Sequence, residues 1–151
     1  MKIVDLIDVP EAIDLLAGWH HQEWSYLNPL LSLAQRKHKM KNFLSPQFIP
    51  STFVAQSERI LGCAAIVESD MDTYKHFTPW LASVFVAPEE RGQGIGSTLV
   101  KHVMAEAKKH GINKLYLFTP DQVPFYEKLG WKLMFKENYR EHEVFVMCVV
   151  L

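Results

Sequence analysis

Residues 84–100 read VFVAPEERGQGIGSTLV, and this stretch combines the signals that decide the fold. An apolar run typical of a strand meets Pro88, and three glycines then stand within five residues before a helix-forming segment begins. A helix that begins after glycines exposes backbone N–H groups, and a large anion can approach them closely because no Cβ atom intervenes. The stretch therefore predicts a strand, a glycine loop and a helix. The loop is either a tight turn or an anion-binding cradle.

Two common nucleotide-binding classes do not match this loop. A P-loop requires Lys and then Ser or Thr after its last glycine, whereas Gly96 is followed by Ser97 and Thr98. The dinucleotide pattern G-x-G-x-x-G, started at Gly92, meets Ser97 where its third glycine should stand. Neither nucleotide hydrolysis nor a nicotinamide cofactor is favoured.

The composition indicates one globular domain, which we place at residues 1–151. Hydrophobic residues make up 48% of the chain and charged residues 22%, so disordered and fibrous classes are excluded. The formal net charge of -1 argues against a dedicated nucleic-acid binder. Cys63 and Cys148 form no disulfide framework, and no Cys/His cluster has zinc spacing, so we expect no metal. Without a signal-like N-terminus or an apolar run of ~20 residues, we expect no membrane contact and a cytoplasmic location.

Hydrophobic periodicity predicts the element order β α α β β β α β α β β. The predicted strands are residues 2–6, 52–56, 60–68, 81–87, 115–118, 131–135 and 144–150. The predicted helices run from Pro10 to Leu27, from Pro29 into the basic run 36–41, from Gly94 to Gly111, and over residues 123–129. Residues 136–143, KENYREHE, are expected to form a polar loop.

Two motifs resemble those of a known family. Residues 86–96, VAPEERGQGIG, resemble the acetyl-coenzyme A motif of the GNAT superfamily of N-acetyltransferases, with Arg91, Gly94 and Gly96 at its key positions. Residues 125–131, FYEKLGW, resemble that family's aromatic-Tyr-Glu-Lys-x-Gly-aromatic signature. The resemblance implies an α/β (α+β) GNAT fold, with a mixed, mostly antiparallel central sheet of about seven strands flanked by about four helices. It also implies that the sheet is splayed at its central parallel pair.

The resemblance further implies acetyl-CoA as co-substrate and a set of residues that bind it. The pyrophosphate is expected on the loop, at Arg91, Gly92, Gln93, Gly94, Ile95, Gly96 and Ser97, with Thr98 as a further donor. The pantetheine arm is expected along the backbone of Val84, Phe85 and Val86. Thr119 stands where the family often has an asparagine that touches the pantetheine. The helix terminus adds about half a positive charge, so a near-neutral chain can still hold a phosphate.

Acyl transfer from a thioester to an amine requires a base and an acid. An ammonium of pKa ~10.4 costs about 4.6 kcal/mol to deprotonate at pH 7. The family's acid corresponds to Tyr126, which can protonate the leaving sulfur. The strand LASVFV carries no carboxylate, so the base that some members have there is absent. Glu23, on a helix face with His20, His21 and Trp24, is our candidate base, and His20 is the alternative.

The acceptor is expected between the first two helices, the loop before Pro79 and the last hairpin. The acids Asp70, Asp72, Glu141 and Glu143 could attract a cationic amine there, or could merely be solvated. The expected acceptor is a primary amine of a small molecule, such as a polyamine, an aminoglycoside or an amino-acid derivative, or a peptide or protein N-terminus. A non-catalytic acyl-CoA binding or sensing domain is the alternative. The sequence does not choose between a monomer and a homodimer, and no nucleic-acid partner is expected.

Overall fold

The computed structural model describes residues 1–151 and contains one seven-stranded sheet with the order β1-β2-β3-β4-β5-β7-β6. All neighbouring strands are antiparallel except β4 and β5, which are parallel. The predicted fold class is therefore confirmed. The strands are β1 (Lys2–Asp5), β2 (Ser51–Gln56), β3 (Ile60–Val67), β4 (Trp80–Val86), β5 (Lys114–Thr119), β6 (Lys132–Tyr139) and β7 (His142–Val150). The α-helices are α1 (Ile13–Trp24), α2 (Leu33–Met40), α3 (Ile95–Lys109) and α4 (Val123–Glu127).

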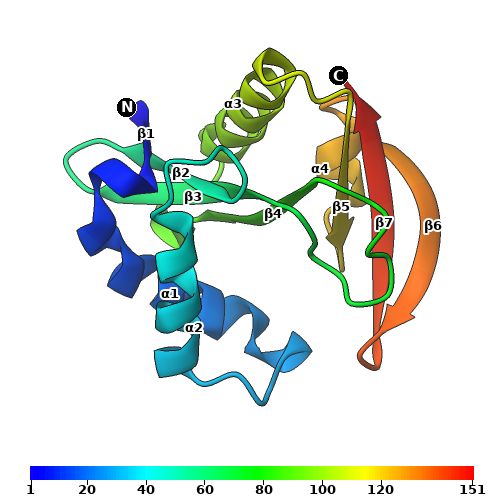
Figure 1. Ribbon diagram of the computed structural model, residues 1–151, viewed down its shortest axis with the longest axis horizontal. Helices are drawn as coiled ribbons and strands as arrows, with labels where there is room; N and C mark the ends of the chain where they lie inside the picture. Colours follow the sequence, from blue (N-terminus) through cyan, green and yellow to red (C-terminus); the bar gives the residue numbers. More distant parts are fainter.

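Helices cover both faces of the sheet (Figure 1), with α1 and α2 on one face and α3 on the other. Helix α3 places Leu99, Val100 and Val103 in the main core, against residues of β2, β3, β5 and β7. Helix α1 places Leu16 and Ala17 in a second core on the opposite face, which includes residues of β2, β3 and β4. The apolar stripe of each helix thus faces the sheet, as helical spacing predicts.

The two parallel strands at the centre of the sheet separate almost at once. Their only paired residues are Trp80 and Tyr116, and the amide of Tyr116 donates to the Pro79 carbonyl at 3.1 Å. Beyond this point β4 and β5 run in clearly different directions (Figure 1). The edge of β4 that faces β5 therefore has unpaired backbone groups from Leu81 onward, which matches the predicted splay.

A β-bulge interrupts β4 inside this splayed region. Ala82 pairs with Ala65 and Phe85 pairs with Cys63, so β4 has one residue more than β3 between these pairs. Ser83 lies in the bulge with a φ of 53°. Because a bulge bends its strand and redirects backbone groups, it contributes to the divergence of β4 from β5.

Several element boundaries differ from the sequence predictions. Helix α1 is flanked by single 3-10 turns, and α2 begins at Leu33 rather than at Pro29, because Ser32 and Gln35 form a reciprocal capping box there. The predicted polar loop 136–143 is wrong, since β6 and β7 extend through it and leave only Arg140 and Glu141 as a turn. Both turn residues have positive φ, at 49° and 69°, as a two-residue hairpin requires.

Candidate active site

The glycine loop presents a row of backbone donors. Gly92 and Gly94 have φ angles of 84° and 82°, which side chains with a Cβ rarely adopt, and Gly94 is the N-cap of α3. None of the amide groups of residues 92–97 donates a hydrogen bond within the chain. The hydroxyl of Thr98 donates to the Gly94 carbonyl at 2.9 Å, so its proton is engaged within the helix. The loop can thus satisfy several phosphate oxygens through the backbone alone.

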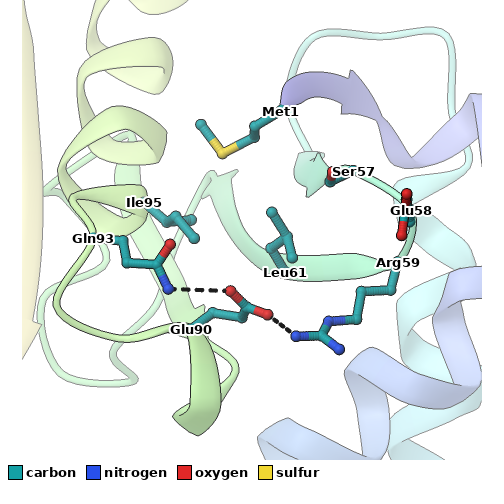
Figure 2. Close-up of a pocket in the computed structure, with 8 residues that line it drawn as sticks. All are labelled: Met1, Ser57, Glu58, Arg59, Leu61, Glu90, Gln93 and Ile95. Carbon is teal, nitrogen blue, oxygen red and sulfur yellow. Dashed lines mark hydrogen bonds and ion pairs between the residues drawn. The ribbon is translucent and has the colours of Figure 1, made fainter.

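Side chains at both ends of the loop fix it to the sheet. Arg91 donates from Nε to the Val86 carbonyl at 3.0 Å, and its guanidinium lies 5.3 Å from the centre of the Phe85 ring. On the other side, Glu90 pairs with Arg59 and accepts from Gln93 at 3.3 Å (Figure 2). Arg91 therefore stabilises the strand–loop junction through its own side chain.

A cavity of about 500 Å³ lies between this loop and the β2–β3 turn (Figure 2). Its lining consists of Met1, Ser57, Glu58, Arg59, Leu61, Glu90, Gln93 and Ile95. The one guanidinium in it is already paired with Glu90, so the remaining charged side chain is that of Glu58. Neither β5 nor α4 contributes to the lining. The cavity therefore borders the loop without reaching the splayed strands.

Gly62 on β3 lies so close to the splayed strand β4 that a side chain at this position would not fit. A Cβ on Gly62 would lie 2.5 Å from the Phe85 carbonyl oxygen and 3.2 Å from Cα of Val86. On the α1 face the Phe85 ring stacks on Trp19 at 5.3 Å and meets Trp24 edge-on at 6.0 Å. The backbone of Val84, Phe85 and Val86 is thus supported from both sides while its edge toward β5 stays unpaired.

The buried thiol of Cys63 and the buried imidazole of His20 lie next to the β4 bulge. Cys63 Sγ lies 3.2 Å from Nε2 of His20 and 3.5 Å from the Ser83 carbonyl. Burial, and secondly Arg36, lower the pKa of His20 to about 4, and burial raises the pKa of Cys63 to about 12. Both groups are therefore neutral at pH 7. His20 is buried and engaged with the thiol, which favours a structural role for it over that of a base.

Tyr126 projects from α4 and is only 8% exposed. It packs edge-on against Phe125 and Trp131, at 4.9 Å and 6.0 Å. Its hydroxyl makes no hydrogen bond within the chain and is not among the fully buried polar atoms, so solvent reaches it. Burial raises the pKa of Tyr126, and the nearby carboxylate of Asp70 raises it further. The phenol is therefore protonated at neutral pH and available to donate.

The acids that could face an acceptor differ in their partners. Asp72 binds Arg140 at 2.6 Å and Glu143 lies 3.6 Å from Lys136, so both are neutralised. Asp70 has neither an ion pair nor a hydrogen bond, and burial raises its pKa to about 7. Glu23 is exposed on α1 and lies close enough to Tyr26 to contribute to that residue's raised pKa. The sequence predicts Asp70 only as one of four acids that could attract a cationic amine. Its lack of a partner could not be predicted, because it depends on the tertiary structure.

Thr119 ends β5 and is buried. Its Oγ1 accepts from the amide of Gln122 at 3.0 Å, which orders the turn that leads into α4. The hydroxyl proton has no acceptor among the chain's own groups, so Thr119 can still donate into the splay. Thr119 and Tyr126 thus belong to β5 and to the helix that follows it, and α4 approaches the glycine loop, because a Cβ on Gly96 would lie 3.4 Å from the Phe125 ring.

This arrangement fits a long thioester substrate with an anionic end. Free loop amides suit a pyrophosphate, the unpaired edge of β4 suits an amide-bearing arm, and the Tyr126 hydroxyl suits a leaving sulfur. Residues that could hold a metal do not cluster, because no group of three or more His, Cys, Asp or Glu side chains is suitably placed. None of the helices is both long and apolar enough to cross a membrane.

Comparison with known proteins agrees with this geometry. Residues 50–133 match the acetyltransferase (GNAT) domain. A solved aminoglycoside 6′-N-acetyltransferase in complex with coenzyme A is similar over 99% of this chain and 97% of its own, at 18% identity and a TM-score of 0.77. A ribosomal-protein-alanine N-acetyltransferase from Brucella melitensis is similar over the whole of both chains, at 18% identity and a TM-score of 0.75. A GNAT family acetyltransferase from Elizabethkingia anophelis with acetyl-CoA bound is similar over 76% of this chain and 83% of its own chain, at 21% identity and a TM-score of 0.61.

The domain match covers more than half of the chain, including the splayed strands and the glycine loop, and it defines an acetyltransferase. The chain belongs to the GNAT family of acetyltransferases. At these identities the solved structures establish the shared fold and leave the acceptor open.

Proposed function

We propose that residues 1–151 form one N-acetyltransferase domain, which transfers the acetyl group of acetyl-CoA to a primary amine by direct attack. The observation that carries this proposal is Tyr126 on α4, the helix that follows β5: the residue is only 8% exposed, yet its hydroxyl has no hydrogen-bond partner in the chain and is not fully buried. A domain that only bound acyl-CoA would need the loop but no proton donor there. Acetyl-CoA supplies the activated thioester, and the chain supplies orientation and proton transfer.

The proposed binding residues divide into two groups. The amides of residues 92–97 hold the pyrophosphate, with Arg91 fixing the loop to β4. The backbone of Val84, Phe85 and Val86 holds the pantetheine arm, with Thr119 donating from the opposite strand. Since most of these contacts come from the backbone, cofactor affinity should depend more on glycine conformation than on side-chain charge.

The acceptor site is proposed where α1, the β5–α4 turn and β7 meet. Tyr26 lies there, 4.8 Å from the ring of His142 and close enough to Glu23 and Asp121 for both to raise its pKa. Two carboxylates beside an exposed tyrosine favour a cationic acceptor. A small polyamine, an aminosugar or a peptide N-terminus fits this chemistry, and the similar enzymes named above act on an aminoglycoside and on a ribosomal protein.

A thiol-release screen with acetyl-CoA against amines and peptides tests the function. We expect turnover with at least one cationic amine. Acetyl-CoA at 100 times its Kd should also stabilise the protein by about 2.7 kcal/mol, or about 5–10 °C in Tm. ATP and NAD at the same concentration are the controls and should produce no shift. Stabilisation by ATP or NAD but not by acetyl-CoA would contradict the assignment, and binding without any turnover would favour a sensing domain.

A further inference from the structure

Asp70 combines three features that no other acid of the chain shares. Its carboxylate forms no ion pair or hydrogen bond within the chain, and its oxygens are not among the fully buried polar atoms. It follows β3 by three residues, and β3 ends at Val67, which pairs with Trp80. Trp80 is also the one residue of β4 that pairs with β5. Asp70 thus lies near the point where the splay begins.

The backbone on the C-terminal side of Asp70 is held rigidly. Met71 is 1% exposed in a cluster with Trp80. The amide of Asp72 donates to the Tyr139 hydroxyl at 3.3 Å, and its carboxylate binds Arg140 at 2.6 Å. Arg140 also donates to the Leu27 carbonyl at 3.1 Å, which connects the loop to the 3-10 turn that follows α1. The chain therefore fixes the neighbours of Asp70 while leaving its own carboxylate without a partner.

Resting on the acyl-transfer function proposed above, we propose that Asp70 is the general base that removes a proton from the acceptor's ammonium group, with Tyr126 as its acid partner. The two side chains come from opposite sides of the splay, Asp70 from the β3–β4 loop and Tyr126 from α4. They lie within Coulombic range of each other, so an amine between them would face both. An unpaired carboxylate in such a place is uncommon unless it serves a function.

The proton balance of the reaction is complete with these two groups. The ammonium transfers one proton to the Asp70 carboxylate, and the nitrogen lone pair then forms the bond to the acetyl carbon. As the C–S bond breaks, the sulfur takes its bonding electrons and accepts the proton of Tyr126. The second amine proton returns to the Tyr126 oxygen, and Asp70 releases its proton to solvent. The products are the acetamide, the free thiol and one proton.

Electrostatics support this division of roles. The groups that face Asp70 are Tyr126 from α4 and Arg140 from the β6–β7 turn, and Arg140 is shared with Asp72 and lies over Tyr139. Burial raises the pKa of Asp70 from 3.8 to about 7, and Arg140 opposes the rise. This change makes proton transfer from an ammonium about 10³-fold more favourable. Once Asp70 is protonated, its charge no longer raises the pKa of Tyr126, so the acid becomes stronger when the sulfur leaves.

The decisive experiment compares Asp70→Asn with Glu68→Gln, an exposed acid two residues away, and with Glu23→Gln, the rival base. For Asp70→Asn we expect kcat/KM to fall by about 10²–10⁴-fold, while the Kd for acetyl-CoA changes less than about threefold. The loss should shrink to under about tenfold with a hydrazide acceptor, which is already neutral at pH 7. Wild-type kcat/KM should also fall as pH drops through about 7, the pKa of Asp70, and this limb should be absent in the variant.

A stability measurement gives a readout that does not depend on the acceptor. A carboxyl whose folded pKa is raised stabilises the fold below its unfolded pKa, and this contribution is lost as pH rises through the folded value. Asp70→Asn should therefore raise Tm at pH 8 and leave it nearly unchanged at pH 4. If the wild type acetylates an acceptor and the Asp70→Asn variant is equally active, the inference is overturned and the proposed function stands. An inactive Glu23→Gln variant beside an active Asp70→Asn variant, or a lower Tm for Asp70→Asn at pH 8, would also overturn it. If wild type acetylates no acceptor of the panel, the proposed function fails and the role of Asp70 fails with it.

Discussion

Replacing Tyr126 by Phe should separate catalysis from binding and stability. The hydroxyl has no hydrogen-bond partner in the chain, so its removal leaves no other group unsatisfied. The ring keeps its packing against Phe125 and Trp131. We therefore expect the free energy of unfolding to change by less than about 1 kcal/mol. The loop amides and the β4 edge are untouched, so affinity for acetyl-CoA should be retained.

Turnover should fall strongly in the same variant. A positioned general acid contributes about 10²–10⁴-fold, which corresponds to about 3–5 kcal/mol of activation free energy. Without Tyr126 the sulfur must leave as a thiolate or find a proton in water. Because the hydroxyl acts only as the C–S bond breaks, the loss should fall on kcat and leave the acceptor KM nearly unchanged.

The assay is steady-state thiol release with the best acceptor of the panel, together with calorimetric titration of acetyl-CoA. Tyr116→Phe serves as the matched control, because that hydroxyl also lacks a partner and its ring lies on β5 against Phe77. We expect this control to retain wild-type turnover. A kcat for Tyr126→Phe within about threefold of wild type would refute its role as the acid. A large increase in the Kd for acetyl-CoA would instead show that the hydroxyl serves in binding.

Three further predictions concern backbone strain and pH. Gly62→Ala should destabilise the fold by about 1–3 kcal/mol and weaken acetyl-CoA binding, because its Cβ would press on the β4 backbone. Gly18→Ala, on a helix with open space around it, is the control and should stabilise by about 0.5–1 kcal/mol; urea unfolding of both variants checks this. Gly94→Ala should cost about 1–2 kcal/mol because its φ is 82°, and calorimetry should show a raised Kd for acetyl-CoA. Because burial and Arg36 lower the pKa of His20 from 6.5 to about 4, the unfolding free energy should fall as pH drops from about 6.5 to 4, by up to about 3 kcal/mol. Urea unfolding at pH 7 and 5 should show a shallower loss in His20→Asn, and an equal loss in both proteins would contradict the assignment.

The sequence predicted those parts of the site that depend on local backbone. Three glycines between a strand and a helix require free amides and positive φ angles, and the structure has both at Gly92 and Gly94. The order of elements was likewise predictable, because hydrophobic periodicity reports which faces are buried. The parallel central pair was predicted from the resemblance to the GNAT superfamily. The last hairpin was predicted but its length was not, since the polar residues 136–139 of its edge strand lack the apolar alternation that identifies strands, and their pairing with β7 is a tertiary effect.

The supports of the splayed strand could not be predicted because they join distant segments. Cys63 contacts His20 from 43 residues away, and its Sγ also lies 3.5 Å from the Ser83 carbonyl in the bulge. The sequence around any one of these three residues does not indicate that the other two lie beside it. Gly62 is similar, because its requirement for a bare Cα arises from the Phe85 carbonyl on the neighbouring strand. A lone thiol and a lone glycine in an apolar strand look like ordinary core residues when only their sequence neighbours are known.

No carboxylate lies on β4, and the proposed base, Asp70, lies instead in the loop that precedes this strand. A base on β4 would lie on an element whose backbone is proposed to hold the pantetheine, so its position would be tied to the donor. Asp70 instead belongs to the loop that Arg140 connects to the last hairpin and to the 3-10 turn after α1, which holds Tyr26 of the proposed acceptor site. Substitutions in those elements should therefore change the geometry of the base together with acceptor binding. This placement predicts that variants of Arg140 alter kcat and the acceptor KM jointly while leaving acetyl-CoA affinity unchanged, because Arg140 contacts neither the glycine loop nor β4.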